Sequence, residues 1–315
     1  MCFLNKLALS AALAIFTAHL LCAQTFAPRA YMVTPLESNA FTVTTSLYHG
    51  GILFDDSSPL TDASGTISIN VSSYYRSLSF FGRSANVTVG LPYVVGSLQA
   101  LVVDQRQKTY RSGLGDGVVR FSVNLMGGPA MTLPQFMKWK QKRLLGASFI
   151  VQTPTGKYDP HLLINIGNNR WAFRPELGYS ERHGKWLVDV YGGVWFFTHN
   201  PEFFSHNSFV SGTQSKTQES IEVAEGHLSY DFKPRLWLSL DGNYWYGGRS
   251  SLNGVQNPDT LQRNSRVGAT TAIPITQHQT LKFSYDRGAS IRFGGNYQAV
   301  QMAWQYGWIG GWLPK

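Results

Sequence analysis

Apolar and polar residues alternate along about twelve short segments of this chain, and almost no segment has helical spacing. Within residues 186–196, Val188 and Val190 share an apolar face. Asp189 and Tyr191 lie on the opposite face. Successive side chains of a β-strand point to opposite sides, so this pattern predicts strands that separate an apolar environment from a polar one.

The N-terminus has the features of a secretory signal peptide. Lys6 precedes an apolar stretch, residues 7–21, and small or uncharged residues follow it. This stretch is too short and unsuitably flanked for a transmembrane helix, so we predict that residues 1–23 are removed. Both cysteines, Cys2 and Cys22, lie within residues 1–23. The mature chain is therefore predicted to have no disulfide and no cysteine-based catalytic or metal site.

The connections between the predicted strands alternate in length. Long ones follow odd-numbered strands and short ones follow even-numbered strands, except for residues 126–143. This alternation is typical of outer-membrane barrels, with the long loops outside and both termini periplasmic, and a soluble β-sandwich or propeller does not require it. The predicted strands are 40–48, 66–79, 85–91, 117–125, 144–152, 170–180, 186–196, 220–232, 236–246, 265–273, 280–286 and 297–308.

We therefore predict an all-β fold, namely a transmembrane antiparallel up-and-down β-barrel of about twelve strands behind a cleaved signal peptide. Residues 24–38 are predicted to form an irregular periplasmic N-terminal segment, and residues 39–315 the barrel. Residues 131–143 contain the one predicted helix. Two interpretations of it remain open: an interfacial helix with Phe136, Met137 and Trp139 facing the membrane, or a long periplasmic connection.

Composition supports a membrane location. Aromatic residues make up 14% of the chain, including 9 Trp and 15 Tyr, as expected for girdles at the two membrane interfaces. The net charge of +9 comes without basic runs or a nucleic-acid module, which favours contact with anionic lipid headgroups and not with nucleic acid. The aromatic last strand resembles the signal read by the barrel-insertion machinery. We expect outer-membrane lipid and that machinery as partners.

Several short stretches together resemble one known family. They are FGRSANV (81–87), LPY (91–93), NLMGGPA (124–130), PTGKYDP (154–160), LINIGNNRW (163–171), GVWFFT (193–198) and WLSLD (237–241). Their order and spacing resemble the outer-membrane transporter family of the phenol meta-cleavage degradation pathway, over nearly the whole mature chain. The resemblance implies a channel in the outer membrane of a Gram-negative bacterium, which passes small organic solutes passively, with aromatic or apolar compounds as candidates.

Charged residues on the polar face of the strands are expected to line the lumen, because a charge facing hydrocarbon is costly. Acidic residues gather on predicted strands six to nine, and basic residues on strands ten to twelve, two and four; Arg174 and Asp286 are exceptions. Two interpretations remain open: opposed charged walls that orient a dipolar solute, or ion pairs that plug a narrow barrel. The candidate pore-lining residues are Arg76, Arg120, Arg174, Glu176, Asp189, Glu225, His227, Asp241, Arg266, Lys282 and Arg292.

Residues 154–169 combine turn-forming residues with an apolar group inside a loop. This group is expected either to constrict or cover the barrel mouth, or to pack on neighbouring loops. Its members, the candidate constriction residues, are Leu162, Leu163, Ile164 and Ile166.

Two alternatives to a channel remain. One is an occluded structural or adhesion barrel whose loops bind partners. The other is an outer-membrane hydrolase, for which Glu225, His227 and Ser229 share one strand face. A nucleophile and its base also need a positioning group and an oxyanion site, so we expect no catalytic residue. The loop histidines lack the paired spacing of metal ligands, and no cofactor motif occurs, so we expect neither metal nor cofactor.

Overall fold

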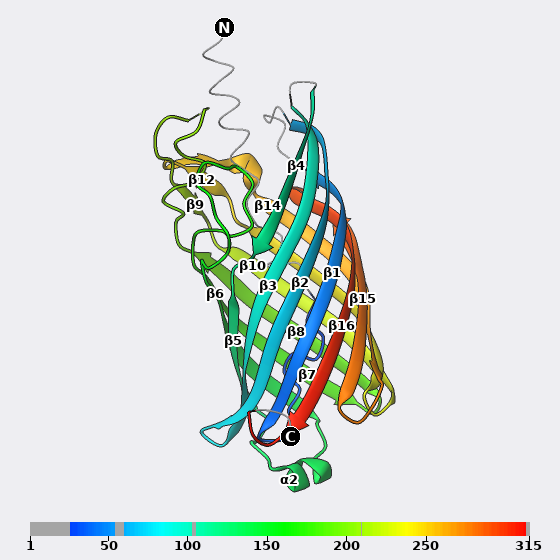
Figure 1. Cartoon of the computed structure of the whole chain (residues 1–315). Helices are drawn as coiled ribbons and strands as arrows, with labels where there is room; N and C mark the ends of the chain where they lie inside the picture. Colours follow the sequence, from blue (N-terminus) through cyan, green and yellow to red (C-terminus); the bar gives the residue numbers. More distant parts are fainter. Residues whose placement is uncertain (1–25, 54–59, 103–104, 209, 313–315) are drawn as a thin grey trace.

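A closed barrel of twelve antiparallel strands makes up most of the molecule (Figure 1). The computed structural model describes residues 26–53, 60–102, 105–208 and 210–312, so the predicted signal peptide and both cysteines lie outside the described residues. The barrel strands are β1 (Ser38–Leu53), β2 (Leu60–Phe80), β3 (Arg83–Val102), β5 (Val118–Met126), β6 (Arg143–Gln152), β7 (Ala172–His183), β8 (Trp186–Phe197), β10 (Ile221–Lys233), β11 (Leu236–Gly247), β14 (Gln262–Pro274), β15 (Gln279–Ser290) and β16 (Gly294–Ile309).

The ring closes where β1 pairs with β16, with Ser38 opposite Ile309. Each strand otherwise pairs with its neighbour along the chain. One end of the barrel, here called the short-turn end, carries tight hairpins such as Phe81-Gly82, whose positive φ angles suit a two-residue turn. The opposite end, here called the long-loop end, carries the long connections. The predicted alternation of loop lengths is confirmed in this respect. Within the described residues, no helix is long and apolar enough to cross a membrane.

One predicted loop is wrong. Residues 92–116 are largely strand, because β3 continues to Val102 and pairs with β4 (Gln105–Leu114) in a hairpin that extends the wall. Pro92 suggested the end of a strand. It lies where the partner of β3 changes from β5, last paired at Gly90, to β4, first paired at Tyr93. At that junction the missing N–H of proline is tolerated.

Short elements cover both ends of the barrel (Figure 1). At the long-loop end, β9 (Lys216–Gln218), β12 (Ser250–Leu252) and β13 (Val255–Asn257) form a small separate sheet, followed by the 3-10 turn η2 (Pro258–Thr260). At the short-turn end, α2 (Leu133–Lys138) is the predicted helix, shorter than residues 131–143.

Two aromatic side chains at α2 turn toward the protein. Phe136 and Trp139 pack against the buried side chains of Val33 and Leu144, so the expectation that they face the membrane is wrong. Met137, the third of the predicted membrane-facing group, is 76% exposed, and Leu133 is 43% exposed. The helix therefore closes the underside of the barrel and presents Leu133 and Met137 outward.

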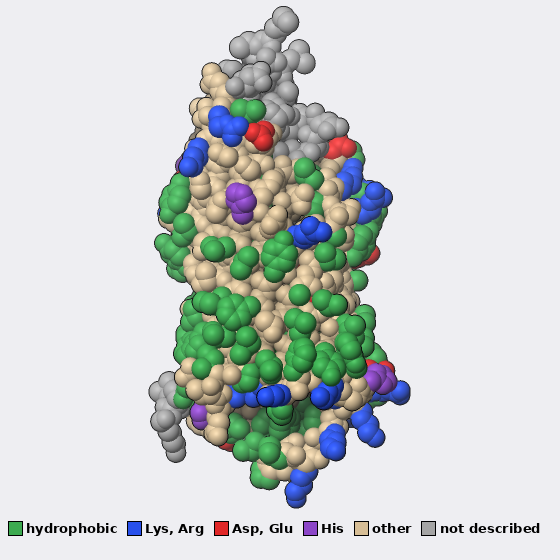
Figure 2. All heavy atoms as spheres, turned by 90° about the vertical axis from the view of Figure 1, so that its right-hand side faces the viewer, with side chains coloured by type: hydrophobic (Ala, Val, Ile, Leu, Met, Phe, Trp, Pro, Cys, Tyr) green, Lys and Arg blue, Asp and Glu red, His purple; other side chains and the backbone are tan. Residues whose placement is uncertain are grey.

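The outer wall of most strands is apolar, as the alternation predicted. Val190 on β8 and Leu238 on β11 are exposed, whereas Asp189 between its neighbours is buried inside. Figure 2 shows hydrophobic side chains across the wall above a row of Lys and Arg at the short-turn end. This arrangement places the apolar belt at the height of hydrocarbon and the cations at the level of lipid phosphates.

Candidate functional site

The lumen contains the N-terminal segment, residues 26–37, which runs inside the barrel wall from the short-turn end. Its side chains contact strands far away in sequence: the Tyr31 hydroxyl donates to Glu176 Oε1 at 2.9 Å. The Phe26 ring lies edge-on to the ring of His227. The prediction that this segment lies on the periplasmic side is therefore wrong, because its aromatic and basic residues find partners on the inner wall.

Tyr31 occupies a slot made by two paired glycines, Gly146 on β6 and Gly178 on β7. A Cβ atom added to either glycine would come within 2.1 or 2.0 Å of the Tyr31 ring. The absence of side chains at these two positions therefore creates the space for the ring. Tyr31 is 2% exposed, and its hydroxyl also lies 3.0 Å from Ser148 Oγ.

Arg29 holds the N-terminal segment to the wall nearer the short-turn end of the barrel. Its guanidinium donates to Asp231 Oδ1 at 2.7 Å and lies over the Trp237 ring at 4.4 Å. Asp231 is also bonded to Arg182. The backbone N–H of Arg29 donates to Asp189 at 3.3 Å. One predicted pore residue, Asp189, is thus engaged by the segment and is 1% exposed.

Five of the predicted pore residues form what we call the charged inner wall: Arg174, Glu176, Glu225, His227 and Asp241. Arg174 Nη2 lies 2.5 Å from Glu176 and 2.8 Å from Glu225. His227 Nδ1 lies 2.8 Å from Asp241, and its Nε2 lies 3.6 Å from Glu225. All five are buried. Burial of charges is costly unless they are paired, and here cations and anions alternate across β7, β10 and β11.

Ser229, the serine considered as a hydrolase nucleophile, does not belong to a catalytic arrangement. Ser229 is buried, and within the described residues no hydrogen bond joins it to His227, whose ring nitrogens face the carboxylates of Asp241 and Glu225. The three side chains share a strand face, as expected, without forming a nucleophile–base pair.

The remaining basic candidates do not form an opposed wall. Arg120 reaches Glu176 at 3.4 Å, and Arg266 Nε donates to Asp286 on the adjacent strand at 2.7 Å. Lys282 has the inward orientation on β15 and is half-buried. Arg120 and Arg266 therefore pair locally with acids on nearby strands. Of the two interpretations of the lumenal charges, this geometry favours ion pairs over a transverse field.

Two predicted pore residues lie outside the lumen. Arg76 is on the outer face, opposite Asn39, where it donates to Asn39 Oδ1 at 2.9 Å and lies over the Trp312 ring. Arg292 is exposed in the connection between β15 and β16 and donates to the carbonyl of Leu261 at 2.6 Å. Arg76 is tolerated outside because it lies near the end of β2, at the membrane interface, where an arginine costs little.

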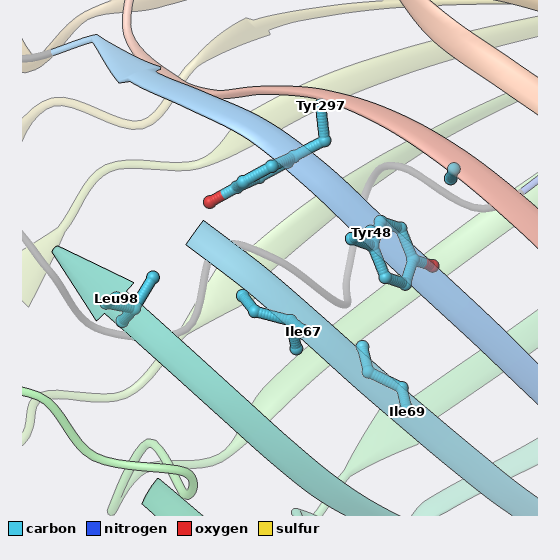
Figure 3. Packing of buried hydrophobic residues seen from close by; sticks show 6 residues of the cluster. Tyr48, Ile67, Ile69, Leu98 and Tyr297 are labelled. Atoms are coloured by element: carbon cyan, nitrogen blue, oxygen red, sulfur yellow. The ribbon is translucent and has the colours of Figure 1, made fainter. Parts of the chain in front are cut away.

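A second part of the inner wall is apolar, and the sequence did not predict it. Ile67 and Ile69 on β2 point inward, opposite to the parity expected of apolar strand residues. Figure 3 shows these side chains beside Tyr48, Leu98 and Tyr297. We call this the apolar inner wall, and its buried members are Tyr48, Ile67, Ile69, Leu98, Tyr297 and Ala299.

Apolar and charged residues occupy different heights in the barrel. Along β8, Asp189 lies toward the short-turn end and Trp195 toward the long-loop end, and both point inward. Trp195 and Trp245 belong to a second apolar cluster that covers the long-loop ends of β7, β8, β10 and β11. Along β8 and its neighbours the lumen is therefore layered, with apolar and aromatic groups above paired charges. On β14, by contrast, the buried Arg266 reaches the carbonyl of Tyr297 in the apolar inner wall.

The mouth loop, residues 153–171, is held by one carboxylate that the sequence did not single out. Asp116, between β4 and β5, is 2% exposed. It accepts hydrogen bonds from Gln152 at 2.9 Å, from Gly156 N at 2.9 Å and from Asn168, through N at 2.9 Å and Nδ2 at 2.7 Å. Both arms of the loop therefore meet at the same side chain. The glycines flanking Asp116 were the available signal.

The predicted constriction residues lie in this loop. Ile164 packs against the apolar inner wall, and Ile166 is buried. Leu162 and Leu163 are half-buried. The contact of Ile164 with the wall places part of the loop inside the barrel mouth.

The neighbouring loops contain an unusual lysine. Lys216 on β9 is 4% exposed, with its Nζ 4.6 Å from the centre of the Phe203 ring. Burial, and secondarily the nearby Arg170 cation, lowers the pKa of Lys216 to about 7. Its charge state therefore changes near neutral pH.

Comparisons with known proteins agree with this architecture. An outer membrane channel from Pseudomonas putida F1 has 18% sequence identity, with a TM-score of 0.72, 90% of this chain and 100% of that chain covered. The β domain of a Bordetella autotransporter has 10% identity and a TM-score of 0.52, with 86% and 100% covered. The transport unit of an Escherichia coli autotransporter has 9% identity and a TM-score of 0.50, with 98% of each chain covered.

These likenesses show the fold, an outer-membrane barrel of Gram-negative bacteria. No curated protein sequence matches this chain. A family model matches residues 54–309, which is most of the chain. The match covers the charged inner wall, the mouth loop, Asp116 and the apolar inner wall except Tyr48. The chain therefore belongs to the family described as Putative MetA-pathway of phenol degradation.

Proposed function

We propose that this barrel is a channel for the passive passage of small organic solutes, with aromatic or apolar compounds as the preferred class. The observation that carries the proposal is the layered lumen. Aromatic and branched side chains such as Tyr48, Ile69 and Trp195 line the long-loop half. An aromatic ring gains from burying its apolar surface against such a wall, whereas a hydrated ion does not.

The layers suggest the order in which a solute would meet the wall. It would enter beside the mouth loop, whose Ile164 packs on the apolar inner wall. It would then pass the paired charges, where an Arg174 or His227 donor suits a hydroxyl or carbonyl group. The N-terminal segment, seated by Tyr31 and Arg29, narrows the last part of this route.

An occluded structural barrel is the second candidate, and the burial of the lumenal side chains favours it. Tyr31 and Asp189 are nearly inaccessible to water in this structure. Passage therefore needs the N-terminal segment or the mouth loop to move. The two candidates differ in whether the protein conducts ions and passes solutes at all.

The test compares flux of phenol and of a pentose into liposomes containing the full mature chain, together with conductance in a planar bilayer. Ile69→Ser makes the apolar inner wall polar, and we expect slower phenol flux with unchanged pentose flux. Leu47→Val, on the outer face of adjacent β1, is the control and should change neither. A folded wild-type protein without conductance or flux would support the occluded barrel.

A further inference from the structure

The outer face of β2 is polar at a depth where the rest of the wall is apolar. Ser68, Asn70 and Ser72 alternate with the inward isoleucines and therefore point outward. Thr45 on β1 lies directly opposite Asn70. We call these four residues the polar stripe. In Figure 1, β1, β2 and β3 lie side by side.

The register places the polar stripe within the apolar belt. On β1, Val43 pairs with Ser72 and Leu47 with Ser68, so exposed apolar side chains lie on both sides of Thr45. On β3, Leu91 pairs with Ser72, Tyr93 with Asn70 and Val95 with Ser68. Leu47 and Leu91 are 52% and 59% exposed. The stripe is thus bracketed by apolar and aromatic side chains.

The hydrogen bonds within the polar stripe do not use all of its donor groups. Thr45 Oγ1 donates to Asn70 Oδ1 at 2.8 Å, and Asn70 Nδ2 lies 3.4 Å from Ser68 Oγ. The second amide hydrogen of Asn70 and the Ser72 hydroxyl have no hydrogen-bond partner among the described residues. Lipid tails offer none, so polar groups here favour a protein surface over lipid.

We infer that the polar stripe is the contact surface between two copies of this chain in the outer membrane. A two-fold contact brings the same patch from each copy together. The carboxamide of Asn70 is both donor and acceptor, so it is complementary to its own symmetry mate. The small Ser68 and Ser72 let the two walls approach closely, and Leu47 and Leu91 supply an apolar rim.

The primary test is the mass of the full mature chain, measured by native mass spectrometry after extraction in mild detergent. We expect a dimer for the wild type. Asn70→Leu should weaken dimerisation about tenfold, because it removes the reciprocal amide contact. Unchanged heat-modifiable gel mobility of this variant would show that its barrel still folds. A wild-type monomer, or an Asn70→Leu dimer as strong as the wild type, would overturn the inference.

Cysteine cross-linking locates the contact. The chain has no cysteine after residue 22, so a single introduced thiol is unambiguous. Ser72→Cys should give an oxidised dimer in native membranes. Val190→Cys, equally outward on β8 across the barrel, is the matched control and should stay monomeric. Equal cross-linking at both positions would mean random collision or a different interface, and would contradict this assignment.

Discussion

The charged inner wall and the apolar inner wall stabilise their buried side chains in different ways. The charged inner wall on β7, β10 and β11 buries ions, and each has an opposite charge nearby: Arg174 between Glu176 and Glu225, and His227 beside Asp241. The apolar inner wall buries the side chains of Tyr48 and its neighbours by packing them against one another. The charged inner wall needs every buried ion to keep an oppositely charged partner, because an unpaired buried charge lowers the free energy of unfolding by several kcal/mol. The apolar inner wall tolerates substitutions better, because a smaller apolar side chain loses only part of its contacts.

The largest expected effect is on the charged inner wall. Asp241 accepts hydrogen bonds from Ser239 and Thr270, both at 2.6 Å, and contacts His227. Asp241→Asn should lower the free energy of unfolding by about 3–5 kcal/mol, because the buried His227 loses the nearer of its two carboxylate partners. Urea unfolding in lipid vesicles measures it.

The control for that variant is an ion pair in solvent. Asp62 and Arg106 are paired at 2.7 Å with most of both side chains exposed. Asp62→Asn should change stability by less than about 1 kcal/mol. If Asp241→Asn were equally mild, the charged inner wall would be water-filled and the contrast between the walls would disappear.

The second prediction removes the N-terminal segment from its slot. Gly178→Val places atoms where the Tyr31 ring lies, and overpacking of this kind costs about 1–3 kcal/mol. The segment should leave the wall, and single-channel conductance should rise. Gly192→Val on adjacent β8 is the matched control, since a Cβ there meets nothing within 4 Å. Equal conductance of the two variants would show that the segment does not limit passage.

A third prediction concerns the loop above the apolar inner wall. Asp116→Asn replaces one of the two accepting oxygens with an N–H₂ group. This group would face either the N–H of Gly156, at the Oδ1 position, or the donors of Gln152 and Asn168, at the Oδ2 position. The mouth loop should loosen by about 1–2 kcal/mol. Hydrogen exchange of residues 153–171 should accelerate while that of β8 stays unchanged. Faster exchange in both would indicate general destabilisation and not a local hold.

The last predicted effect depends on pH. The pKa of Lys216 is about 7 in the folded loop and 10.5 in the unfolded chain, so the unfolded state binds more protons between these values. Loop stability should therefore fall as pH drops from 10.5 to 7 and level off below 7. Protease resistance of residues 198–220, measured against pH, should lose this dependence in Lys216→Met. Lys108→Met, at an exposed lysine, should retain it.

Period-two alternation predicted the strands well, because β8 and its neighbours face lipid on one side and a polar interior on the other. It gave the wrong facing for β2. Ile67 and Ile69 alternate as regularly as Val188 and Val190, yet they point inward. Alternation defines two faces of a strand without saying which face is inside. The inner face of β2 is apolar because it belongs to the apolar patch in the lumen, and the sequence alone does not reveal this patch.

The N-terminal segment was missed for a different reason. Pro28 and Pro35 indicated irregular backbone, which is compatible with either side of the wall. The partners that fix it are distant: Tyr31 and Glu176 are 145 positions apart. The same holds for Asp116, whose partner Asn168 is 52 positions away. Single-sequence patterns describe neighbours along the chain and contain no information about such contacts.

The seat of Tyr31 inside a closed ring also constrains how the protein is made. A completed cylinder has no open side, so the N-terminal segment enters either lengthwise through one end or before β1 meets β16. In the second case the wall would be assembled around the N-terminal segment, and β6 and β7 would pack against the Tyr31 ring before β1 pairs with β16. The N-terminal segment would then act as a core for barrel assembly, and its residues would be under selection for biogenesis as well as for the passage of solutes.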